Sequence, residues 1–82
     1  MQILTSDKEI VVLDKKSYVE IMEVFYEDEY YGVSVILINQ NKEKILGTYE
    51  DSDTAEIVVE NIFQNLDKDR ININKINQLL EA

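Results

Sequence analysis

The first part of the chain alternates short apolar segments with polar turns, a pattern typical of antiparallel β-strands. The apolar segments QILT and IVVLD are separated by turn-forming residues, which predicts a hairpin over residues 2–14. In residues 18–26, the spacing of Val19, Met22 and Phe25 also suits a helix, but the many valine, isoleucine and tyrosine residues favour a strand. This part of the chain is therefore expected to form three strands.

The middle of the chain is predicted to add two more strands. Residues 27–32, EDEYYG, form the expected connection to an apolar strand over residues 33–39. No polar residue interrupts the run VILI in that strand, which indicates that both of its faces are covered. Residues 44–49 are expected to return antiparallel to it. Gly47 in this last strand favours a bend where the strand leaves the sheet, with a bulge or a close approach to the backbone as alternatives.

The hydrophobic period then changes to that of an amphipathic helix. The predicted helix runs from about Thr54 to Leu66, with Asp53 as its N-cap and Glu56 as the acid of a capping box. Ile57 falls at the margin of its apolar face. That face is expected to lie on the sheet and carries residues at helical spacing: Ala55, Val58, Val59, Ile62, Phe63 and Leu66.

The C-terminal segment follows a polar hinge over residues 67–70, DKDR, and its pattern is ambiguous. Ile71 and Ile73 alternate with asparagines as in a short strand, so residues 71–74 fit either a strand or a helix. Helical spacing favours a short helix over about residues 74–81. A helix of this length is not stable alone, so it is expected to dock on the domain or on a second copy of the chain.

These elements predict one α+β domain over residues 1–82. Its expected architecture is a four- to five-stranded antiparallel sheet, packed on one face by the amphipathic helix, with a short C-terminal helix. One helix does not cover both faces of such a sheet, and the second face carries apolar residues as well. The chain is therefore expected to form a homodimer through a sheet face or edge.

Charge and composition narrow the possible functions. Seventeen acidic and eight basic residues give a net charge of −9, which disfavours direct contact with nucleic acid or an anionic membrane and suits a basic partner. The N-terminal residues lack the features of a signal peptide, and no apolar run is long enough to span a bilayer. The expected location is the cytoplasm.

The residue types that most small catalysts need are missing. The chain has no histidine and no cysteine, and its two glycines are too far apart for a phosphate-binding loop. Asp51 and Asp53 have the spacing that opens a calcium loop, but Ile62 stands where that loop requires glutamate. We therefore expect a protein that is not an enzyme and that carries no metal and no cofactor.

The candidate binding site is a cluster of aromatic and acidic residues within the segment VFYEDEYYG. Tyrosine rings offer broad contact surfaces, and the carboxylates between them can pair with arginine through hydrogen bonds and cation–π contacts. Stacking of a nucleotide ring is a second interpretation, which the negative charge opposes. A third is that one or two tyrosines pack in the sheet while the acids face water. The cluster consists of Tyr26, Glu27, Asp28, Glu29, Tyr30 and Tyr31.

The segment KILGTYEDSDTAEIVVENIFQNL resembles small uncharacterised proteins encoded by phages, prophages and plasmids of AT-rich, mostly Gram-positive bacteria. The similarity lies in a strand ending near an LGxY sequence, an acidic turn, and a helix with an early alanine and aliphatic residues at helical spacing. The matching residues are Leu46, Gly47, Tyr49, Ala55, Val58, Val59 and Ile62.

This resemblance implies a protein that acts by binding. The leading expectation is an anti-CRISPR-like inhibitor or nucleic-acid mimic that binds a basic or nucleic-acid-binding host defence protein in the host cytoplasm, through the acidic tyrosine-rich cluster. The alternative is a homodimeric sponge that sequesters a nucleotide immune signal, with Arg70 and Lys44 as candidate anion-binding residues. A third hypothesis is a structural or assembly accessory protein.

Overall fold

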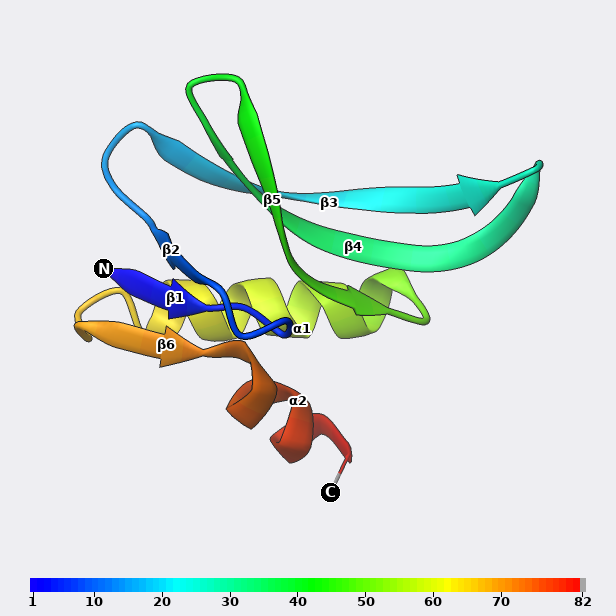
Figure 1. The fold of residues 1–82 in the computed structure, drawn as a ribbon. Coiled ribbons are helices and arrows are strands. Elements are labelled where there is room, and N and C mark those ends of the chain that lie inside the picture. Colours follow the sequence, from blue (N-terminus) through cyan, green and yellow to red (C-terminus); the bar gives the residue numbers. More distant parts are fainter. Residues whose placement is uncertain (82) are drawn as a thin grey trace.

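A computed structural model describes residues 1–81 and has the predicted α+β class (Figure 1). Within these residues the chain forms six strands and two helices. The strands are β1 (Gln2–Leu4), β2 (Ile10–Val12), β3 (Ser17–Tyr26), β4 (Glu29–Asn39), β5 (Lys42–Tyr49) and β6 (Arg70–Asn72), and the helices are α1 (Ser52–Gln64) and α2 (Ile73–Glu81). The strands expected over residues 18–26 and 44–49 are present, and so is the hairpin expected over residues 2–14.

The strands form two three-stranded sheets and not the single sheet that the sequence predicted. One sheet is antiparallel in the order β3-β4-β5. The other has the order β2-β1-β6, and in it β1 is antiparallel to β2 but parallel to β6, with Ile3 opposite Ile71. This parallel pair joins segments near the two ends of the chain. Short strands so far apart in sequence leave no local pattern that would predict their pairing.

The hairpin between β3 and β4 closes through a two-residue turn. Glu27 and Asp28 have φ values of 50° and 67°, and positive values at both central residues define a type I′ turn. This turn matches the right-handed twist of the strands, so pairing extends to its edge. The connection predicted over residues 27–32 is therefore too long, because β4 already begins at Glu29.

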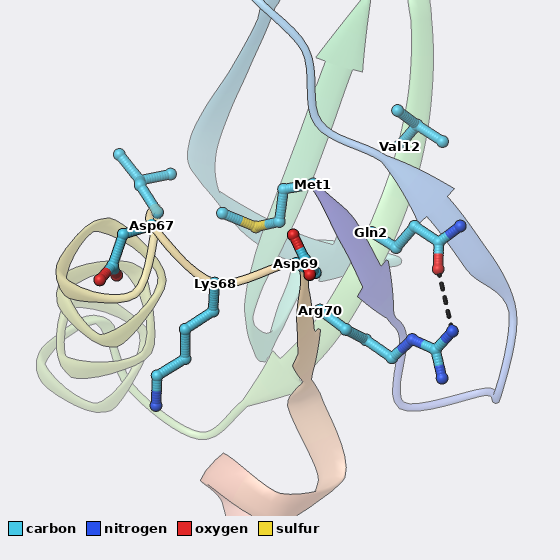
Figure 2. Close-up of a pocket in the computed structure, with 8 residues that line it drawn as sticks. Met1, Gln2, Val12, Asp67, Lys68, Asp69 and Arg70 are labelled. Carbon is cyan, nitrogen blue, oxygen red and sulfur yellow. Dashed lines mark hydrogen bonds between the residues drawn. The ribbon is translucent and has the colours of Figure 1, made fainter.

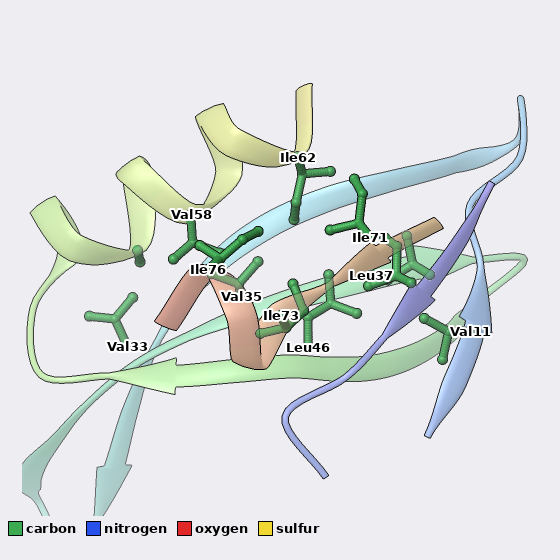
Figure 3. Close-up of a cluster of buried hydrophobic side chains, with 12 residues drawn as sticks. Val11, Val33, Val35, Leu37, Leu46, Val58, Ile62, Ile71, Ile73 and Ile76 are labelled. Atoms are coloured by element: carbon green, nitrogen blue, oxygen red, sulfur yellow. The ribbon is translucent and has the colours of Figure 1, made fainter. Parts of the chain in front are cut away.

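The core lies between the β3-β4-β5 sheet, the smaller sheet and the two helices, where apolar side chains meet (Figure 3). From β4, every second residue points into it, as the period of two in a strand requires. Every element except β3 contributes at least one fully packed side chain, whereas β3 adds only the partly buried Val19. The buried core residues are Ile3, Val11, Val33, Val35, Leu37, Leu46, Ala55, Val58, Ile62, Ile71, Ile73 and Ile76.

Within residues 1–81, no helix covers the face of the β3-β4-β5 sheet opposite the core, which is called the outer face below. Ile36 and Ile38 of β4 point to this face and are still only 5% and 9% exposed. The strands on either side screen them, with Tyr18 opposite Ile38 on β3 and Ile45 opposite Ile36 on β5. The central strand is thus buried on both faces as predicted. The apolar side chains that screen it, Tyr18 and Ile45, are themselves about half exposed to solvent.

Helix α1 begins earlier than predicted, and its N-cap is Asp51, not Asp53. The Asp51 carboxylate accepts a hydrogen bond from the backbone N–H of Thr54 at 2.8 Å, and this bond lowers the pKa of Asp51. Asp53 instead lies in the first turn, where its charge complements the helix dipole. Both aspartates fit the sequence rules for an N-cap, and the position of the preceding strand decides between them.

The buried face of α1 is narrower than predicted. Ala55, Val58 and Ile62 are buried, whereas Phe63 and Leu66 are about half exposed. Phe63 is turned by about 100° from Ile62 around the helix axis, which places it at the margin of the contact. Leu66 lies beyond the end of the helix. Both leave apolar surface in solvent at this end of α1.

The asparagine-rich segment divides cleanly between a strand and a helix. Residues up to Asn72 pair with β1 as β6, and α2 starts at Ile73, one residue before the predicted start. The Asn72 side chain accepts hydrogen bonds from the backbone N–H groups of Asn74 at 3.0 Å and Lys75 at 3.4 Å, so it caps the helix. Ile73 and Ile76 are buried, which docks α2 on the chain's own core.

Gly47 lies inside β5 and not at a bend. The register of β5 against β4 shifts beside it, so that Leu46 is an extra residue and forms a β-bulge. The Tyr49 ring crosses directly over Gly47, and a Cβ atom there would lie 2.5 Å from the Tyr49 hydroxyl. This hydroxyl donates a 2.7 Å hydrogen bond to Asn77 Oδ1, while burial raises the pKa of Tyr49. The two alternatives to a bend, a bulge and a close approach, both apply.

Replacing Asp51 with alanine is expected to lower Tm by about 4–8 °C at neutral pH, because the N-cap bond to α1 is lost. Asp53→Ala is the matched control and should lower Tm much less. Since folding lowers the pKa of Asp51 below its usual 3.8, the cap stabilises the fold above that pH and its contribution fades as pH falls further. Thermal melts of both variants at pH 7 and at about pH 2 test this, and equal losses in the two variants would contradict the assignment of the cap.

Candidate functional site

The acidic and aromatic residues singled out in the sequence all lie at the end of the β3–β4 hairpin, which projects beyond α1 (Figure 1). Residues 25–31 are called the hairpin tip below. Tyr26, Tyr30 and Tyr31 are 63%, 52% and 64% exposed, and the three acids between them are exposed as well. The arrangement in which one or two tyrosines pack in the sheet is therefore not observed.

The exposed rings are ordered by contacts with one another. Phe25 and Tyr30 form one edge-to-face pair with ring centroids 5.9 Å apart, and Tyr26 and Tyr31 form a second pair at the same distance. Such cross-strand pairs stabilise a hairpin and limit the rotamers of its rings. Phe25 was not among the residues predicted for the site. Its role becomes visible only once the two-residue turn sets the pairing across the strands.

The tip is connected to the turn between β5 and α1. The Tyr30 hydroxyl donates a hydrogen bond to the Glu50 backbone carbonyl at 3.1 Å. A groove of about 500 Å³ lies beside this contact, and Tyr31, Glu50, Asp51 and Thr54 are among the residues that line it. The tip and the acidic turn thus form one continuous surface, to which Glu50 and Asp51 add two carboxylates that were not among the residues predicted for the site.

The cations of the chain are unevenly distributed. No lysine or arginine occurs in residues 17–41, a stretch that contains five acids. Most of the basic residues lie in or close to the three turns β2–β3, β4–β5 and α1–β6, at the end of the molecule opposite the hairpin tip (Figure 1). These residues are Lys15, Lys16, Lys42, Lys44, Lys68 and Arg70. The hairpin tip therefore presents its carboxylates without a neighbouring cation to neutralise them.

This arrangement suits recognition of cationic groups. An arginine that approaches the tip meets carboxylates able to accept paired hydrogen bonds and tyrosine faces able to make cation–π contacts. A phosphate would meet only negative charge there. Among the described residues, no group of three or more acidic side chains is arranged to hold a metal ion.

Arg70 lies in a different groove, of about 740 Å³, close to the N-terminus (Figure 2). Its guanidinium donates a 3.2 Å hydrogen bond to Gln2 Oε1, so one of its hydrogen-bond donors is already used within the protein. Lys68 adds a second positive charge to the lining, but Asp67 and Asp69 lie in the same groove. The cations and the acids of this groove largely cancel each other.

Lys44 is not part of that groove. Its ammonium group forms an exposed ion pair with Glu9, with Nζ and Oε2 3.5 Å apart. The structure of one chain therefore does not bring Lys44 and Arg70, the two candidate anion-binding residues, into one pocket.

No protein-family model matches the chain, and no curated protein or solved structure shows significant similarity to it. In the part of the chain that the structure describes, neither helix has the length and apolar character needed to cross a membrane. The class of site therefore rests on geometry and charge: an exposed acidic and aromatic binding surface.

Proposed function

We propose that this chain is a non-enzymatic binding protein whose hairpin tip occupies the basic surface with which another protein binds nucleic acid. One observation carries the proposal: the tip combines three carboxylates with three exposed tyrosines on a stretch of chain that has no cation. Carboxylates occupy the phosphate-binding arginines of the partner, and tyrosine rings cover the surface between them. The partner then has no free site for its nucleic acid.

The net charge of −9 favours the same mode of action. A strongly anionic protein with its positive charges at the far end is steered tip-first toward a basic surface, which raises the association rate. Binding of this kind weakens as salt screens the charges.

The resemblance to proteins of phages and plasmids supports a specific setting for this inhibition. In that setting the partner is a nucleic-acid-binding component of host defence, and the chain acts in the host cytoplasm like an anti-CRISPR protein. The outer face supports a homodimer in which two tips project outward, because Tyr18, Met22 and Ile45 are each more than 40% exposed on it.

Affinity capture with the tagged chain tests the proposal. The chain is incubated with a lysate of an AT-rich Gram-positive bacterium, and the bound proteins and small molecules are identified by mass spectrometry. A basic partner that is released by salt and displaced by its own nucleic acid is the expected result. A retained nucleotide without a protein partner would overturn the proposal in favour of the nucleotide sponge, and assembly into larger particles would favour the accessory role.

A further inference from the structure

Strand β3 has one edge without a pairing partner. In the order β3-β4-β5 it is the outermost strand, and its ten residues pair only with β4 (Figure 1). Within residues 1–81, no other backbone hydrogen bond involves Tyr18 to Tyr26. The opposite edge of the sheet differs, because the Leu46 carbonyl of β5 accepts a hydrogen bond from the Ser6 N–H at 2.9 Å. The long free edge of this sheet is therefore the one formed by β3.

The side chains along this edge are acidic and apolar. Glu20 and Glu23 lie in the middle of the strand, and the period of two places them on opposite faces. Ile21, Met22 and Phe25 beside them are 36%, 42% and 57% exposed. A strand that carries such exposed apolar residues and no cation is complementary to an extended segment that combines arginine or lysine with apolar residues on each face.

The carboxylates of β3 disfavour some of the pairings with a second copy of the same chain. Because opposed residues in an antiparallel pair point to the same face, Glu20 would lie opposite its own counterpart in a pairing of two β3 strands centred on Glu20, and Glu23 would do so in one centred on Glu23. Like charges directly opposite each other destabilise a strand pair. The same carboxylates that attract a basic segment therefore disfavour self-association in these two registers, a common role of charges on edge strands.

We propose that β3 captures an extended basic segment of the partner by β-strand addition. This inference rests on the proposed function, because the segment belongs to the same basic protein that the hairpin tip binds. Backbone hydrogen bonds along β3 supply affinity, and the acidic side chains select for basic residues. The strand is about 33 Å long, which accommodates a segment of about ten residues that runs directly into the tip.

Peptide binding tests the inference directly. The probe is a fluorescein-labelled peptide of about eight residues in which pairs of arginines alternate with pairs of valines, so that each face of the strand carries both residue types, and β3 accommodates this length. One control carries glutamate in place of arginine, and a second keeps the arginines but is N-methylated at every peptide bond. We expect the first peptide to bind in an anisotropy titration at about 150 mM salt and both controls to bind at least about tenfold more weakly. Equal binding of the N-methylated peptide would overturn strand addition, as would no binding of the first peptide at about 1 mM.

Two variants of the protein separate this inference from the proposed function. Glu20→Lys/Glu23→Lys should abolish peptide binding, and the amide resonances of β3 should no longer shift when the peptide is added. Reversal of the charges at the hairpin tip should leave most of the peptide binding intact. If the first variant kept full affinity for the captured partner while the tip variant lost it, strand addition would be overturned and the proposed function would stand. The opposite pattern would overturn the role of the tip.

Discussion

Reversing the three carboxylates of the hairpin tip is expected to abolish partner binding without unfolding the chain. In the variant Glu27→Lys/Asp28→Lys/Glu29→Lys, each acceptor of a charge-assisted hydrogen bond becomes a repelling ammonium group. The affinity for the captured partner should fall at least about 100-fold. Each attractive contact between a carboxylate and a basic residue of the partner is replaced by repulsion between two cations, which costs far more than a change in the net charge of the protein. The three residues are exposed, so the circular dichroism spectrum should be unchanged.

The matched control distinguishes the tip from the overall charge. Glu56→Lys/Glu60→Lys/Asp67→Lys changes three other exposed acids, and because each exchange adds two positive charges, both triple variants have a net charge of −3 instead of −9. Isothermal titration at about 150 mM salt should show a much smaller loss for this control, mainly through slower association. Equal losses would mean that the partner responds to net charge and not to the tip.

Replacing Gly32 with alanine should destabilise the fold by about 3 kcal/mol or more, enough to unfold much of a small domain. Gly32 has φ of 142°, a backbone conformation that residues with a side chain rarely adopt. A Cβ atom there would lie 2.4 Å from the carbonyl oxygen of Tyr49 in the paired strand. Neither backbone segment can withdraw without breaking the pairing of β4 with β5, so the clash is not relieved locally.

Gly47→Ala is the control for this prediction. The added Cβ at this position would also be too close to a neighbour, but that neighbour is the side chain of Tyr49, which can rotate away. The loss should then be about 1–2 kcal/mol, mostly from the hydrogen bond of Tyr49 to Asn77 and the altered packing. Urea unfolding of both variants measures the difference. A larger effect at Gly47 than at Gly32 would contradict the description of the two sites.

The hydrophobic pattern was sufficient to predict most elements of this fold. The alternation in residues 18–26 and the helical spacing of Ala55, Val58 and Ile62 each depend on neighbours close in sequence, and all these elements are present. The residue at which a helix begins is harder to predict, because neighbouring residues can be equally suitable as its N-cap. Asp51 and Asp53 are both suitable caps, and only the path of the chain out of β5 selects Asp51.

The residue types of the candidate site were predictable from the sequence, but their arrangement on the surface was not. Its acids and tyrosines are visible in the sequence, whereas the edge-to-face contact of Tyr26 with Tyr31 depends on the type I′ turn and on the shift in strand register between Val24 and Phe25. The contribution of Glu50 depends on the contact of its carbonyl with Tyr30, twenty residues away in sequence. Register and contact are properties of the paired strands, so they follow from the assembled hairpin.

The sequence by itself determined the class of the fold, five of the six strands in residues 1–81, the amphipathic helix and the acidic, histidine-free chemistry, because these depend on residue types and local spacing. The tertiary structure alone decided that the strands divide into two sheets, that β1 pairs with the distant β6, and that β3 keeps a free edge. It also decided that most cations gather opposite the tip. These features depend on which distant segments meet when the core closes, and short strands carry too little local information to specify their partners.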